Sequence, residues 1–373
     1  MARKNRVSVY DGIYHVTSRI ANRAMLLARD EVKDMIMERI VSIADFSGVE
    51  IWAFCIMDNH LHLFVHVPPV PERFWLDSND EPAAYAFGMR PPECREPIWS
   101  PTGDCPRPPR PGLVFMLDDE EMLARLARLY GPDRAEAIGR SWQSQREHGR
   151  GSAVDEAKER YCRRMYNLTQ FVKTLKETVS RWFNAGFGHV GNLWEGRFYS
   201  GVVEKDAVVK AVVAAYVGYN PVKAKAAAAP EAWRWSSYAL AVSDLGPDGS
   251  RCRAMYERML GRPWKEVRAT LESMYADELP ASITPDKLKE WLDDYDENAE
   301  GSWEGARVYR ASQAIRAPMK LFSGAYIGRD FAFFDRVVAL LPEKFPRAGR
   351  RSVKRCRAFV WELPQPDTLK DAA

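Results

Sequence analysis

Several features of secreted, disulfide-bonded and membrane proteins are missing from this sequence. The six cysteines are scattered over 373 residues and no two form a Cys-x-x-Cys pair, so neither a disulfide framework nor a zinc ribbon is predicted. No apolar run is long enough to span a membrane, and the first residues contain no apolar segment of the kind found in secretory signals. We therefore expect a cytoplasmic protein with no membrane partner.

A large excess of charge of one sign is missing as well. The net charge is only +3, which by itself barely suggests a nucleic-acid partner. Basic residues nevertheless gather between residues 344 and 357, in a stretch without an acid, and acidic residues gather between 293 and 304. Such runs are usually solvated surface, but the basic run also suits a phosphate backbone. Its candidate DNA contacts are Arg350, Arg351, Lys354 and Arg355.

Regular structure is predicted over much of the chain. With 46% hydrophobic residues and 373 residues in all, the sequence favours one core with additions. Eight prolines between Pro91 and Pro111 exclude a regular element there. Residue patterns predict strands near 13–20, 51–56, 61–67 and 197–203, and helices near 31–46, 118–130, 153–166, 168–186 and 206–220.

The most informative stretch is a strand that carries two histidines, His60 and His62. β-Branched and aromatic residues between Leu61 and Val67 predict the strand. Alternate strand residues point to the same face, so the two imidazoles lie about 6–7 Å apart. Such a pair is a good start for a divalent-metal site, although two half-exposed histidines on a polar sheet face would give the same pattern. His66 shares this face but lies too far along the strand to bind the same ion.

A second segment carries a tyrosine and an asparagine one helical turn apart, Tyr216 and Asn220, followed by Pro221. Together with the His-Leu-His of residues 60–62, this segment resembles the single-tyrosine HUH transposases of bacterial insertion sequences, and most closely their REP-associated relatives. Further blocks that fit this family in the expected order are Gly12–Arg19, Arg164–Phe171, Asn192–Phe198 and Trp233–Tyr238. The resemblance covers roughly residues 5–67 and 160–240.

The resemblance implies an α+β fold: a ferredoxin-like sandwich with a central antiparallel sheet, the HUH endonuclease core. This core would be discontinuous, formed by residues 1–67 and 160–240. Residues 68–159 would form a proline-rich and helical insertion, and residues 241–373 a C-terminal extension with a basic tail segment.

The resemblance also implies a chemistry. Tyr216 would be the nucleophile that attacks a DNA phosphate, forming a 5′-phosphotyrosine that conserves the energy of the broken bond. His60 and His62 would hold Mg²⁺ or Mn²⁺, which polarises the phosphate. Asn220 lies on the same helix face as Tyr216 and would supply an amide oxygen as the third ligand. The substrate would be single-stranded DNA with a hairpin, as in REP-like elements, and the activity DNA transposition.

Other interpretations of these residues stay open. Tyr216 could be a core aromatic residue, Tyr219 is a rival nucleophile three residues later, and Asn220 could mark only a helix end before proline. Arg197 and Lys223 are candidate phosphate contacts or solvated surface residues. The main alternative function is a domesticated protein that binds hairpin DNA without cutting it, and a nuclease that uses water in place of the tyrosine is a third. The resemblance is compatible with a monomer or a homodimer.

Aromatic residues outside the motifs also have two interpretations. Trp194, Trp233 and Trp235 could stack on bases, as in single-strand binders, although packing around the sheet explains them more simply. His15 is expected to be a sheet residue, with a DNA contact as the alternative.

Overall fold

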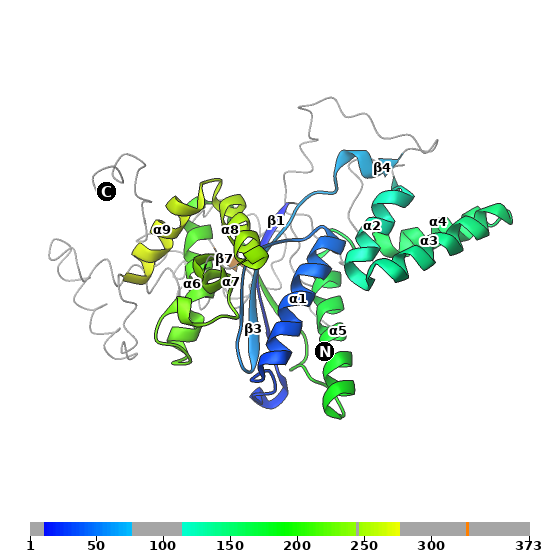
Figure 1. Ribbon diagram of the computed structural model, residues 1–373. Helices are drawn as coiled ribbons and strands as arrows, with labels where there is room; N and C mark the ends of the chain where they lie inside the picture. Colours follow the sequence, from blue (N-terminus) through cyan, green and yellow to red (C-terminus); the bar gives the residue numbers. More distant parts are fainter. Residues whose placement is uncertain (1–10, 77–113, 244–245, 277–325, 328–373) are drawn as a thin grey trace, which may run out of the picture.

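The computed structural model describes residues 11–76, 114–243, 246–276 and 326–327 (Figure 1). Its fold is α+β, as predicted, and is built on a five-stranded sheet with the order β2-β3-β1-β6-β7. The strands are β1 (Gly12–Arg19), β2 (Glu50–Ile56), β3 (His60–Val67), β6 (Tyr199–Val203) and β7 (Tyr326–Ile327). Pairing is antiparallel from β2 to β6, and β7 joins the edge parallel to β6.

A β-α-β-β-α-β unit forms the centre of this sheet. Helix α1 (Asp30–Ser47) connects β1 to β2, and α5 (Leu168–Phe187) precedes β6. The resulting order β2-β3-β1-β6 is that of a ferredoxin-like fold. Both helices lie on the same side of the sheet in Figure 1 and pack on each other. They present the apolar stripes that their spacing predicts.

The other side of the sheet carries a second layer of helices (Figure 1). It consists of α6 (Ala207–Lys223), η4 (Pro230–Ala232), α7 (Ser237–Ser243), α8 (Gly246–Leu260) and α9 (Trp264–Ala276). Helix α6 packs on β2 and β3, α8 packs on β2, and α9 packs on α6. Thus α8 and α9, which follow residue 240 where an extension was expected, pack on the sheet and on α6.

Successive side chains of β3 point alternately to the two helical layers. Leu61, Leu63 and Val65 are at most 1% exposed and belong to the core. His60, His62 and His66 take the opposite face, towards α6. Because helices cover both faces, the histidine face is not an open polar surface, and any chemistry there takes place in a largely buried environment.

Among its described residues, the insertion between β3 and α5 has three α-helices and a small two-stranded sheet. Short strands β4 (Trp75–Leu76) and β5 (Val114–Phe115) pair, β4 following η2 (Glu72–Phe74). Helices α2 (Asp119–Tyr130), α3 (Pro132–Glu147) and α4 (Gly151–Cys162) follow. Helix α3 is absent from our predicted elements, because it buries little besides Ala135 and Trp142 and shows no clear apolar stripe. Most of the proline-rich stretch lies outside the described residues.

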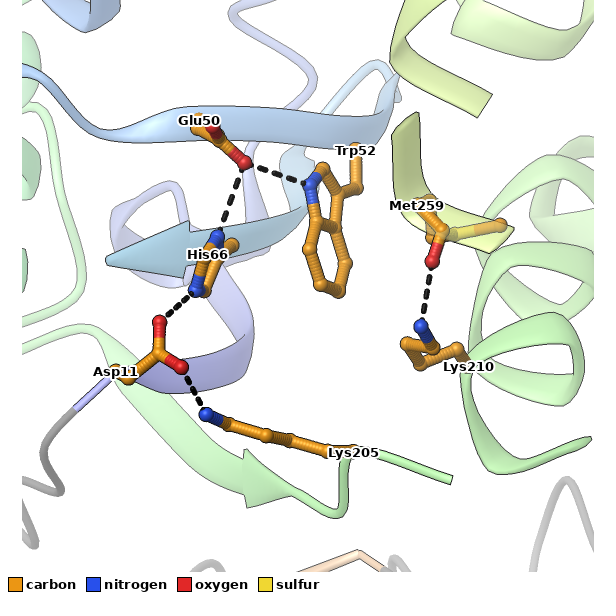
Figure 2. A network of polar contacts seen from close by, with 7 residues as sticks. All are labelled: Asp11, Glu50, Trp52, His66, Lys205, Lys210 and Met259. Carbon is orange, nitrogen blue, oxygen red and sulfur yellow. Dashed lines mark hydrogen bonds and ion pairs between the residues drawn. The ribbon is translucent and has the colours of Figure 1, made fainter. Parts of the chain in front are cut away.

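A polar network closes the end of the sheet where β3 finishes (Figure 2). His66 lies between two carboxylates, with Nε2 2.6 Å from Asp11 Oδ1 and Nδ1 3.0 Å from Glu50 Oε2. Lys205, just after β6, pairs with Asp11, and the Trp52 indole donates to Glu50. The network therefore ties together the starts of β1 and β2, the end of β3 and the end of β6. None of the described helices is long and apolar enough to cross a membrane.

Candidate metal and nucleophile site

The site forms where the C-terminal half of α6 crosses β3. Asp206 caps the N-terminus of α6, because its carboxylate accepts from the Val209 N–H at 3.1 Å. Tyr216 and Asn220 follow on one helix face. Asn220 is 7% exposed and His62 is 5% exposed, and Asn220 Nδ2 lies 2.8 Å from His62 Nε2. Two segments 158 residues apart in sequence thus meet at one point.

Tyr216 lies beside the histidines. Its ring is perpendicular to the imidazoles of His15 and His62, with 5.6 Å between ring centroids in each case. Lys223 Nζ lies 5.2 Å from the centroid of the Tyr216 ring. The rival Tyr219 has a different neighbour, because its ring stacks on Tyr275 of α9 at 5.6 Å. Of the two tyrosines, Tyr216 is therefore the one in contact with the histidines.

Helix α6 does not end at Asn220. It continues through Pro221 to Lys223, so the asparagine is a helical residue and not only the last residue before a breaker. Gly218, between Tyr216 and Asn220, permits close packing of α9. A Cβ placed there would lie 2.4 Å from the Tyr275 hydroxyl and 3.2 Å from Tyr238 Cβ.

Two residues of β1 fix the orientation of His62. The His15 ring stacks on the His62 ring at 5.1 Å and 8°, and His15 Nε2 lies 2.9 Å from His62 Nδ1. Thr17 Oγ1 lies 3.2 Å from the same nitrogen. With Asn220 donating its N–H to His62 Nε2, the proton of neutral His62 lies on Nδ1 and points to β1. The Nε2 lone pair then faces α6.

Asn59 fixes the orientation of His60 in the same way. Its Nδ2 lies 3.2 Å from the Arg23 carbonyl oxygen, which can only accept, so Nδ2 is the donor there. Its Oδ1 therefore faces His60 Nδ1 at 2.7 Å and accepts the proton of that nitrogen. The lone pair of neutral His60 is therefore on Nε2. Asn22 and Arg23 both have φ of 56°, so this bond also holds a strained turn.

The three imidazoles are held in the neutral form. Burial lowers the pKa of His15 to about 4. Burial, with the nearby Arg19 charge, lowers the pKa of His60 to about 4. Burial lowers the pKa of His62 well below its usual value, helped by the neighbouring His15 and His60 and by Lys223 and Arg19. Neutral imidazole is the form that binds a metal ion.

These donors fit a divalent cation. The His60 and His62 rings lie 5.0 Å apart at 79°, and the Asn220 side chain also hydrogen-bonds to His60. A rotation of the Asn220 amide would replace its N–H by its oxygen, which suits a hard cation. Each imidazole already has the second hydrogen bond that metal-ligating histidines need. Within the described residues, no group of three His, Cys, Asp or Glu side chains is placed to hold a metal ion.

The basic residues considered as DNA contacts lie at different distances from this site along the chain. Arg19 pairs with His60 across β1 and β3. Lys223 and Arg197 are exposed, Lys223 at the end of α6 and Arg197 just before β6. The predicted contacts Arg350, Arg351, Lys354 and Arg355 lie outside the described residues. Trp194 and Trp233 are buried and donate to backbone carbonyls of Lys176 and Ile56, which is the packing interpretation of these residues.

Four residues of the site were not predicted: His15 as a partner of His62, and Thr17, Asn59 and Arg19. The signal that could have found them is the pairing of β1 with β3, which places Thr17 opposite His62 and Arg19 opposite His60. That register depends on which residues of the two strands align, and a single sequence does not determine it. Asn59 directly precedes His60, and this position is the only feature of the sequence that points to its role.

Comparisons with known proteins match the N-terminal part of the chain, which includes β3. The family model for IS200-like transposases matches residues 8–72, which contain β1, α1, β2 and β3. No curated protein matches. A solved structure of a REP-associated tyrosine transposase bound to a REP hairpin is similar with 14% identity and a TM-score of 0.31, covering 66% of this chain and 90% of that chain. That likeness is too distant to inform the site. The predicted resemblance to the single-tyrosine transposases of insertion sequences is thus confirmed over the segment that carries His60 and His62.

Proposed function

We propose that this protein is a metal-dependent DNA strand transferase that nicks single-stranded DNA at hairpin elements through a tyrosine nucleophile, as a step of DNA transposition. The observation that carries the proposal is the meeting of Tyr216 and Asn220 with His60 and His62 between α6 and β3. The family match of residues 8–72 supports a DNA substrate. The candidate metal is Mg²⁺ or Mn²⁺, held by His60, His62 and Asn220.

The proposed step exchanges one phosphoester for another. The Tyr216 hydroxyl oxygen bonds to phosphorus as the bond from phosphorus to the 3′ oxygen breaks, and the phenol proton ends on the released 3′-hydroxyl. The products are a 5′-phosphotyrosine and a free 3′ end. A bound divalent cation would supply charge that polarises the phosphate. His15, Thr17 and Asn59 keep the two metal-binding nitrogens free of protons.

Burial supports the assignment of Tyr216 over another nearby tyrosine. The ring centroids of Tyr199 and His15 lie 6.4 Å apart. Burial raises the pKa of the Tyr199 hydroxyl and so opposes the phenolate form of this residue. Exposed Lys223 lies over the Tyr216 ring and could neutralise an approaching phosphate. Arg197, and Arg350, Arg351, Lys354 and Arg355 of the basic stretch, remain candidate DNA contacts.

The test is covalent capture of DNA. Purified protein is incubated with labelled single-stranded hairpin DNA from repeats flanking its own gene, with and without Mn²⁺, and adducts are resolved on denaturing gels. We expect a metal-dependent adduct that Tyr216→Phe abolishes. Tyr219→Phe and Tyr199→Phe are the matched controls: each removes a tyrosine hydroxyl, from α6 and from beside His15 respectively, and each should retain the adduct.

The alternatives give different results in the same experiment. Cleavage that survives Tyr216→Phe without an adduct would indicate attack by water. Retarded DNA without cleavage under any metal would contradict the strand-transfer function and leave the hairpin-binding protein. No observation in the structure favours either of these alternatives over the tyrosine mechanism.

A further inference from the structure

Helix α1 buries a lysine directly behind the turn that precedes the histidine strand. Lys33 is 2% exposed, although lysine is rarely buried without a partner. Its amine lies 2.6 Å from Asp58 Oδ1 and donates to the Ala28 carbonyl oxygen at 2.9 Å. The approach to Asp58 is off the line of a good hydrogen bond, so the contact is best described as an ion pair.

Two tryptophans complete the surroundings of this amine. Lys33 Nζ lies 4.2 Å from the ring centroid of Trp235 and 5.1 Å from that of Trp233. Both belong to a segment bonded to the last residue of β2, because Ile56 N–H donates to the Trp235 carbonyl and the Trp233 indole donates to the Ile56 carbonyl. The amine therefore contacts both the turn formed by residues 57–59 and the tryptophan segment bonded to Ile56, the residue before that turn.

That turn leads directly to the first metal-binding candidate. Asp58 is followed by Asn59, whose amide fixes the proton on His60 Nδ1. The backbone of the turn is held on the other side by two more bonds, from Leu27 N–H to the Asp58 carbonyl and from Ile20 N–H to the Asn59 carbonyl. These two bonds join neutral backbone groups, whereas the contact of Lys33 with Asp58 joins two charged side chains.

We propose that Lys33 is a positioning residue for the metal site: by pairing with Asp58 it holds the 57–59 turn, and through Asn59 it keeps the proton of His60 on Nδ1 and off the metal-binding Nε2. The proposal rests on the proposed function for its metal, but its first step, from Lys33 to the proton position on His60, concerns the protein without metal. Outer partners of metal-ligating histidines typically change metal affinity by about 10- to 100-fold when removed.

The experiment compares two buried lysines. Lys33→Met removes the charge and keeps the length of the side chain. Lys158→Met is the matched control, because Lys158 is 6% exposed and pairs with Asp119 at 2.7 Å, both residues belonging to helices of the insertion. Two quantities are measured in folded full-length protein: the ¹⁵N shifts of the His60 ring in the absence of metal, which report its tautomer, and the dissociation constant for Mn²⁺.

We expect Lys33→Met to convert His60 from one tautomer to a mixture and to weaken Mn²⁺ binding about tenfold or more, with Lys158→Met changing neither. A folded Lys33→Met protein with unchanged His60 shifts would overturn the proposal. A wild-type protein that binds no Mn²⁺, with the tautomer change still present in Lys33→Met, would contradict the proposed metal function and leave the positioning role intact.

A second variant guards against loss of folding. Asp58→Asn removes the other half of the ion pair at a position that is 37% exposed, and it should shift the His60 tautomer in the same direction. If Lys33 acts through Asp58, the double variant Lys33→Met, Asp58→Asn is no worse than the more damaging single variant. Additive effects on the His60 shifts would show that the two residues act separately and would refute the proposed path.

Discussion

His15 and His62 stack with 5.1 Å between ring centroids, and the Nε2 atom of His15 lies 2.9 Å from Nδ1 of His62. The first of these residues is 1% exposed and its Nδ1 has no hydrogen-bond partner among the described residues. An unpaired buried donor costs stability. The pair is therefore maintained at some expense, which is expected where the orientation of one ring serves the site.

His15→Phe separates this orienting role from packing. Phenylalanine keeps the stacked ring but removes the nitrogen that accepts from His62, so we expect Mn²⁺ affinity to fall by roughly 10- to 100-fold. The free energy of unfolding should stay the same or rise by about 1 kcal/mol, because the orphan donor disappears. Calorimetric titration with Mn²⁺ and urea unfolding would measure the two effects. Equal affinity in the variant would mean that Thr17 alone orients His62.

Asn220→Leu tests the third ligand. The substitution keeps the shape of the side chain and removes the amide, so a metal held by His60 and His62 loses one ligand and its affinity should fall at least about tenfold. Asn220→Gln shifts the amide by one methylene and should retain measurable binding. Electron paramagnetic resonance of free Mn²⁺ would give both dissociation constants. Identical values for wild type and Asn220→Leu would remove Asn220 from the metal site.

The network of Figure 2 predicts a dependence of stability on pH. Burial opposes the charged form of His66, but hydrogen bonds and charge from Asp11 and Glu50 outweigh it and raise the His66 pKa. This contribution to stability is complete below the unfolded pKa and is lost as pH rises through the folded one. At Asp11 burial raises the pKa of the carboxyl, but hydrogen bonds and charge from His66 and Lys205 outweigh it and lower that pKa to about 2. That contribution is lost as pH falls towards this value.

His66→Gln should therefore flatten the fall in stability above neutral pH. The slope that it removes is at most about 1.4 kcal/mol per pH unit, the limit for one proton. Urea unfolding at several values between pH 5 and 9 in roughly half-unit steps would measure it. His148→Gln, at an exposed position in the insertion, is the control. A variant that keeps the wild-type slope would show that other groups dominate the titration.

The close approach of α9 to α6 gives a prediction for stability alone. Gly218→Ala would place Cβ 2.4 Å from the Tyr275 hydroxyl, and the required shift should cost about 1–3 kcal/mol, more than the gain in helix propensity. Tyr275→Phe removes that hydroxyl, which has no partner among the described residues. The alanine should therefore be much better tolerated in the Tyr275→Phe background. Thermal unfolding of the two single variants and the double variant would show whether the effects are coupled.

Much of the fold could be predicted from local pattern. The β3 alternation and the apolar stripes of α1 and α5 follow from the periodicity of their residues. Helix α3 could not be predicted in this way, because a helix that buries only Ala135 and Trp142 has little periodicity to detect. Its stability comes from packing on α2 and α4, a property of the folded chain.

Part of the candidate site can likewise be predicted from local pattern, and part cannot. Tyr216 and Asn220 are one helical turn apart, and His60 and His62 are one strand repeat apart, so their shared faces are visible in sequence. The partners of His62 come from another element, because His15 and Thr17 belong to β1, and Lys33 of α1 pairs with Asp58 in the turn before His60. Their positions depend on strand register and helix packing, which a single sequence does not fix. The role of each named residue in catalysis stays a prediction.

The neutral donor set of the site has a thermodynamic consequence. A cation held by His60, His62 and Asn220 would keep both of its charges, with Arg19 and Lys223 nearby to repel it. A DNA phosphate would relieve that excess of positive charge, so the two ligands should bind cooperatively. Linkage requires each to raise the affinity of the other by the same factor. The protein would then acquire its metal mainly together with its substrate, so that the supply of single-stranded DNA, more than the concentration of metal, decides when the site is assembled.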